Sequence, residues 1–143
     1  MGARVFGHIV VAVDFSDSSQ AALTLGIELA RRYEAKLTAV HVVEPVPTYA
    51  DSGIPGLDAD IEREAAYGYL KGLLERLAPG FVAEEVVLVG HAATGVLQVA
   101  ANVHADLIVA GVHGRNAMDL LFFGSTANRL VREASCSVLT VKD

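Results

Sequence analysis

Five short apolar runs alternate along the chain with segments whose apolar residues recur at helical spacing. The runs lie at 8–13, 36–43, 82–89, 106–110 and 137–141. The first is apolar at every position from Ile9 to Val13, which is typical of a strand buried on both faces of a parallel sheet. This alternation predicts an α/β protein: one three-layer domain with a five-stranded parallel open sheet, right-handed crossovers and helices on both faces.

The segments between the runs predict four helices, at about 17–32, 58–77, 94–103 and 125–134. Ser16 or Asp17 is expected to cap the first helix and Thr94 the third, because their side-chain oxygens can accept a hydrogen bond from a first-turn N–H group. In the second helix, apolar spacing predicts that the residues facing the core include Ile61, Ala65, Leu73 and Leu77.

The connection from 44 to 57 contains three of the four prolines, so it is expected to be irregular and exposed. No composition shift marks a second domain. We therefore expect one domain that spans residues 1–143.

Charge and hydropathy exclude some classes of partner. Asp and Glu outnumber Lys and Arg by 17 to 11, a net charge of −6 that opposes attraction to nucleic acid or anionic lipid. No apolar run reaches the ~18 residues that a membrane-spanning helix needs. Residues 1–8 lack the apolar core of a signal peptide, so we expect a cytoplasmic protein with no nucleic-acid or membrane partner.

A glycine-rich loop follows the fourth apolar run. Gly111-Val112-His113-Gly114 is separated by nine residues from Gly124-Ser125-Thr126, which opens the last predicted helix. A helix start offers free N–H groups and the positive end of the peptide dipoles, and glycine lets an anion approach the backbone closely. About a dozen residues separate Ala110 from Ser125, more than the roughly 2 to 6 of a simple turn. The order of strand, glycine loop and helix start predicts a phosphate-binding site.

Sheet topology predicts where this site lies. In open parallel sheets, ligands bind beyond the carboxyl ends of the strands, where the strand order reverses. For a chain that starts at the centre of its sheet, that crevice falls between the first and fourth strands. Asp14 and Gly111, which end these two strands, should face each other across it.

The glycine spacing Gly-x2-Gly-x9-Gly-Ser, the segments 11–16, 41–42 and 105–109, and the final run 137–141 resemble the universal stress protein family, in its ATP-binding branch. The resemblance covers nearly the whole chain. It implies the strand order 3-2-1-4-5 and a nucleotide at the predicted crevice.

The resemblance also implies a role for each residue of the site. The Val42 backbone would bind the adenine edge, Asp14 would lie near the sugar or base, and Gly111 would approach the ribose. Phosphates would be held by a further set, namely Gly114, Gly124, Ser125 and Thr126, with Arg115 adding charge at the rim. Two alternatives stay open: Asp14 can be a cap of the following turn, and Val42 can be a core residue.

These observations favour a regulatory or stress-response protein that binds ATP. ADP and AMP are alternatives, because Asp119 would repel extra phosphate charge unless Mg²⁺ bridged it. We assign no catalytic residue and expect no metal site, since the histidines and Cys136 lack metal-ligand spacing. Slow ATP hydrolysis or autophosphorylation is one alternative function, and an interaction protein with a vestigial loop is another.

The last run, Val138 to Val141, should lie at an edge of the sheet with unpaired backbone groups, which favours pairing with a second copy. The family resemblance implies the same homodimer. The alternative is an edge guarded by Lys142 and Asp143.

Overall fold

The protein is described by a computed structural model, which covers residues 5–45, 59–112 and 124–143. The strands are β1 (His8–Ala12), β2 (Lys36–Val43), β3 (Glu84–Val89), β4 (Leu107–Gly111) and β5 (Ser137–Val141). The helices are α1 (Asp17–Tyr33), α3 (Ala59–Leu77), α4 (Ala92–Asn102) and α5 (Ser125–Glu133). The alternation of strands and helices predicted from the sequence is therefore confirmed.

All strand pairs are parallel, and the sheet has the order β3-β2-β1-β4-β5. The prediction of a five-stranded sheet in the order 3-2-1-4-5 is confirmed. β1 lies at the centre, between β2 and β4, and its three middle residues are fully buried. Because the chain leaves β1 toward β2 and later returns to β4, the strand order reverses at β1.

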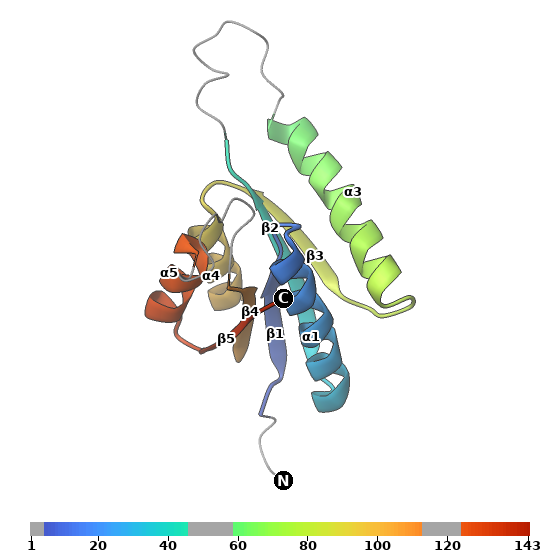
Figure 1. Cartoon of the computed structure of the whole chain (residues 1–143), viewed down its shortest axis with the longest axis vertical. Coiled ribbons are helices and arrows are strands. Elements are labelled where there is room, and N and C mark those ends of the chain that lie inside the picture. Colours follow the sequence, from blue (N-terminus) through green and yellow to red (C-terminus); the bar gives the residue numbers. More distant parts are fainter. Residues whose placement is uncertain (1–4, 46–58, 113–123) are drawn as a thin grey trace, which may run out of the picture.

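Helices cover both faces of the sheet, with α1 and α3 on one face and α4 and α5 on the other (Figure 1). Side chains of the central strand alternate between the two layers. Ile9 and Val11 pack with Leu23 and Ile27 of α1, whereas Val10 packs in the cluster that contains Leu130 of α5. The protein thus has two apolar layers separated by one sheet. No helix in the described ranges is long and apolar enough to cross a membrane.

The core face of α3 differs from the one predicted. Leu73 is buried and Leu77 packs against the core, but Ile61 is 58% exposed and Ala65 is also exposed. The buried positions of α3 are instead Ala66, Leu70, Leu73 and Leu74. Helix α3 carries apolar residues on more than one face, so their spacing alone did not identify the face that meets the sheet.

The amino ends of the strands are joined by polar side chains. The Asp106 carboxylate accepts hydrogen bonds from the backbone N–H groups of Gly7 and His8, at 2.7 and 3.0 Å. His8 Nε2 lies 2.7 Å from the hydroxyl of the fully buried Thr38, which donates to Glu84 at 3.5 Å. These contacts connect four neighbouring strands at the end of the sheet opposite the predicted crevice.

Candidate functional site

A pocket lies at the carboxyl ends of the central strands, where the strand order reverses. It is lined by Ala12, Val13, Asp14, Ser19, Val40, Val42, Ala92, Val96, Ala110, Gly111, Thr126 and Ala127. These residues come from β1, β2 and β4 and from the starts of α1, α4 and α5. The described residues form a cavity of about 70 Å³. Ligand clefts usually measure roughly 300–1,000 Å³, so this cavity would enclose only part of a nucleotide.

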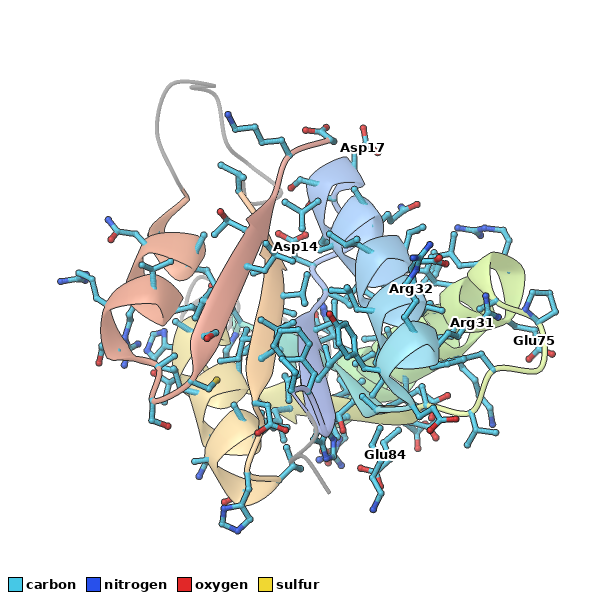
Figure 2. The ribbon with its side chains drawn as sticks, turned by 90° about the horizontal axis from the view of Figure 1, so that it is seen from below. Asp14, Asp17, Arg31, Arg32, Glu75 and Glu84 are labelled. Atoms are coloured by element: carbon cyan, nitrogen blue, oxygen red, sulfur yellow. The ribbon has the colours of Figure 1, made fainter. Side chains whose placement is uncertain are left out.

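Asp14 lies between the end of β1 and the start of α1 (Figure 2). Its Oδ1 accepts hydrogen bonds from the Ser16 backbone N–H, at 3.0 Å, and from the Ser16 hydroxyl. Ser16 is the N-cap of α1, because its side chain accepts from Ser19 N–H. Asp14 therefore braces the capping turn and lines the pocket at the same time, so the two roles considered for it do not exclude each other.

Phe15 gives the turn after Asp14 its shape. Its φ of 66° is in the left-handed region, which costs a non-glycine residue on the order of 1–3 kcal/mol. The Phe15 ring packs against His41, with centroids 4.6 Å apart, and lies 6.1 Å from the ring of Tyr69. His41 Nδ1 in turn lies 2.7 Å from the Val13 carbonyl oxygen. The strained residue is thus held by aromatic packing beside the pocket.

Val42 belongs both to the core and to the pocket wall. Its side chain is 8% exposed and packs in the apolar layer beneath α4. A Cβ at Gly95 of α4 would lie 2.7 Å from Val42 Cγ2, so only glycine lets the helix sit this close to β2. The described contacts do not test the predicted adenine contact of the Val42 backbone.

Gly111 lines the same pocket as Asp14, and the two residues come from the ends of the neighbouring strands β4 and β1. Its lack of a side chain has a reason inside the protein. A Cβ at Gly111 would lie 2.7 Å from the Ser18 carbonyl carbon, so the glycine allows α1 to start directly against β4. Packing of α1 therefore accounts for this glycine whether or not a ribose lies beside it.

Three helices start around the pocket, and their first turns differ. The first turn of α1 is capped by Ser16. At α4, the Ala92 N–H donates to Glu44 Oε1 at 2.8 Å. At α5 the N-cap is Gly124, and no side chain of the described residues caps it. Within the described part of the chain, α5 is therefore the one of these three helices whose first N–H groups have no side-chain acceptor.

The structure describes three of the five residues predicted to lie near the phosphates, namely Gly124, Ser125 and Thr126. Thr126 lines the pocket, and Gly124 and Ser125 precede it at the start of α5. Gly124 has φ −61° and ψ 156°, a conformation open to any residue, so positive φ is not the reason for glycine there. Gly114 and Arg115 lie outside the described residues.

The sequence suggested Thr94 as the cap of α4, and this prediction is wrong. The helix begins two residues earlier, at Ala92, with His91 as N-cap. The Thr94 hydroxyl instead accepts a hydrogen bond from Arg129 Nη1 at 2.7 Å, and Arg129 Nε donates to Glu133. These contacts join α4 to α5 close to the pocket.

Sequence reasoning missed two contributors to the site. Ser19 lines the pocket and accepts a hydrogen bond from the Asp14 backbone N–H at 3.2 Å. Its position one turn into a capped helix is a signal that could have identified it. Glu44 acts through a partner 48 residues away, so no local pattern marks it.

The fold and the pocket define a doubly wound α/β protein with a small pocket at its topological switch point. The model of the universal stress protein family matches residues 6–142, and the chain belongs to that family.

Known relatives agree with this assignment. The chain is 36% identical to universal stress protein A homolog 1 of Coxiella burnetii, covering 95% of this chain and 96% of the relative. Universal stress protein UspA from Lactobacillus plantarum has a similar structure, with a TM-score of 0.80, 29% identity and coverage of 98% and 99% of the two chains.

Two other similar structures contain nucleotides. One is a universal stress protein in complex with cAMP, with a TM-score of 0.73, 26% identity and coverage of 96% and 97%. The other is the universal stress protein from Archaeoglobus fulgidus in complex with dAMP, with a TM-score of 0.68, 27% identity and coverage of 96% and 99%.

Proposed function

We propose that this protein is a regulatory, stress-response member of its family that binds an adenine nucleotide in the pocket between β1 and β4. The sequence favours ATP, with ADP and AMP as alternatives and Mg²⁺ as an optional companion. The observation that carries the proposal is the start of α5, which adjoins the pocket and has no side-chain cap among the described residues. Backbone N–H groups and the helix dipole make such a start a binding site for phosphate.

The pocket has one part suited to each end of a nucleotide. Val40, Val42 and Val96 provide an apolar wall for a base, and Asp14 provides a carboxylate for the sugar hydroxyls or base. Gly124, Ser125 and Thr126 would hold phosphate. Gly114 and Arg115 keep the roles that the sequence implied for them.

The two nucleotide complexes support the adenine moiety. cAMP and dAMP share an adenine base and a single phosphate, and both are bound by proteins that resemble this chain over most of its length. ATP shares the adenine base of both ligands, but it carries a linear triphosphate, whereas the single phosphate of cAMP is cyclised onto the sugar and dAMP lacks the 2′-hydroxyl.

Binding accounts for the pocket better than phosphoryl transfer does. Phosphoryl transfer needs a metal, a positioned nucleophile and strong cationic stabilisation. The described lining contains no Lys or Arg, and its one carboxylate, Asp14, already accepts two hydrogen bonds from Ser16. We therefore propose a protein whose conformation or assembly responds to nucleotide occupancy.

Isothermal titration with ATP, ADP, AMP and GTP tests the proposal. We expect adenine nucleotides to bind and Gly124→Val to weaken them at least tenfold, because branched methyl groups would cover the α5 start. Gly72→Val is the control, since nothing lies within 4 Å of a Cβ at that exposed position. If no adenine nucleotide binds, or if Gly124→Val binds as wild type does, the proposed site is wrong.

Asp14 is tested in the same way. Asp14→Ala should weaken binding of a nucleotide, whereas Asp17→Ala, at the exposed tip of α1, should not (Figure 2). Equal affinities for the two variants would remove Asp14 from the site and leave the phosphate contacts untouched.

We also propose that the protein forms a homodimer through β5. This strand is the outer one next to β4, and its Leu139 is 37% exposed. An edge strand with unpaired backbone groups can extend its sheet by pairing with a second copy.

A further inference from the structure

The Glu44 side chain occupies the start of α4. Its Oε1 accepts a hydrogen bond from the Ala92 N–H at 2.8 Å, and His91 at the N-cap position makes no side-chain cap bond. Ala92 itself lines the pocket. A carboxylate at this position neutralises the positive end of the helix dipole and satisfies one of its N–H groups.

This contact places a negative charge at the α4 side of the pocket. Without Glu44, α4 and α5 would both present positive helix ends to a ligand. With it, α5 is the one of the two whose start has no side-chain acceptor among residues 5–45, 59–112 and 124–143. Asp14 adds another carboxylate, and no Lys or Arg belongs to the described lining. Among the described residues, the α5 start is thus the place for an anion, while one carboxylate lies in the pocket lining and another lies at the start of α4, whose first residue belongs to that lining.

We propose that Glu44 determines which phosphorylation state the pocket prefers, by disfavouring nucleotides in proportion to their negative charge. The inference rests on the proposed function and narrows it: the carboxylate favours adenosine monophosphate relative to the triphosphate. Asp14 is unsuited to a test of charge alone, because its carboxylate also braces the turn that caps α1. Glu44 is exposed and contacts one backbone N–H group, so its charge can be altered without repacking the core.

The test compares AMP and ATP binding by isothermal titration in chelator-containing buffer, so that the phosphates keep their full charge. Glu44→Gln retains an acceptor for the Ala92 N–H but removes the charge. Glu44→Ala removes both. Glu75→Gln is the matched control, since it makes the same change in net charge on α3, far from Asp14 (Figure 2).

We expect Glu44→Gln and Glu44→Ala each to shift the affinity ratio toward ATP by about threefold to fivefold at low salt, with no shift for Glu75→Gln. In about 1 M salt, where the Debye length is about 3 Å, the shift should disappear. Only Glu44→Ala should also lower Tm by a few degrees, because it alone uncaps α4.

Two results would overturn the inference while leaving the proposed function intact. One is an ATP-to-AMP affinity ratio that moves equally in Glu44→Gln and Glu75→Gln. The other is a shift that survives high salt, which would mean that shape and not charge is responsible. Absence of any nucleotide binding to the wild-type protein would instead overturn the proposed function and this inference together.

Discussion

Gly111, the last residue of β4, lies directly against Ser18 in the first turn of α1. Ser18 is only 3% exposed, and an added Cβ at Gly111 would approach its backbone to 2.7 Å. A backbone atom cannot rotate away as a side chain can. The closeness of α1 to β4 therefore depends on this glycine, and so does the shape of the pocket between them.

Gly111→Ala should lower the free energy of unfolding by about 2 kcal/mol or more, because α1 must shift to admit the methyl group. Urea denaturation followed by circular dichroism measures the loss. Gly68→Ala is the control, since nothing lies within 4 Å of a Cβ there. If Gly111→Ala is as stable as the wild-type protein, the start of α1 can move to accept the methyl group at little cost in free energy.

Gly68 and Gly72 of α3 should respond in the opposite direction to substitution. Both are exposed inside a helix, and a Cβ at either position meets nothing within 4 Å. Each change to Ala should raise the free energy of unfolding by roughly 0.5–1 kcal/mol, since glycine loses more backbone entropy on folding. Thermal denaturation should show a Tm rise of about 2–4 °C per kcal/mol.

Gly26→Ala is the matched comparison for α1, because its Cβ would lie 2.6 Å from Val11 Cγ2 and should therefore destabilise the protein. If Gly68→Ala or Gly72→Ala also lowered Tm, the exposed face of α3 would have to pack against something in solution.

His8 should make stability depend on pH. Burial lowers the pKa of His8 below its ordinary value of 6.5; Glu84 and Asp106 oppose this shift and Lys36 adds to it. The unfolded chain then takes up the proton at a higher pH than the folded protein does. This contribution to the free energy of unfolding is complete above the unfolded pKa and is lost as the pH falls through 6.5 toward the folded pKa.

Urea unfolding between about pH 8 and pH 5 measures this dependence. His8→Gln should flatten the decline below pH 6.5 relative to wild type. His91→Gln, an exposed residue at the start of α4, should leave the decline in place. Identical pH profiles for His8→Gln and wild type would contradict the role given to His8.

Thr140 tests the proposed dimer. Val112 N–H donates to the Val141 carbonyl oxygen at 2.9 Å, so Val141 directs its backbone toward β4. Backbone direction alternates along a strand, which turns the Thr140 N–H outward. Thr140→Pro should therefore remove a donor from the free edge while preserving the pairing with β4, and sedimentation should change from dimer to monomer.

Thr140→Val keeps the N–H group and should remain dimeric. A wild-type protein that sediments as a monomer would remove the proposed interface altogether. A Thr140→Pro variant that stays dimeric would place the contact elsewhere.

The sequence predicted the architecture well because the fold rests on local patterns. The unbroken apolar run from Ile9 to Val13 is typical of a strand buried on both faces, and β1 lies buried at the centre of the sheet. The same logic brought Asp14 and Gly111 to one pocket, since parallel strands end at the same edge. The strand order itself came from the family resemblance.

The rest depended on contacts that no local pattern contains. Helical spacing with Ala65, Leu73 and Leu77 predicts that Ile61 lies in the core, yet α3 turns it toward solvent. Thr94 suits a cap chemically, but α4 begins at Ala92, where Glu44 comes from the end of β2. The reason for glycine at position 111 is a helix start more than ninety residues away, which only the folded chain reveals.

The left-handed turn at Phe15 has a consequence for ligand affinity. Because packing of the Phe15 ring against His41 and the hydrogen bond from Ser16 hold the loop between β1 and α1, Asp14 is already in place before a ligand binds. A ligand then does not have to order this loop when it binds, so less of the binding free energy is lost to ordering the protein. A substitution that loosens the contact between Phe15 and His41 should therefore lower the affinity for a ligand that does not touch either ring.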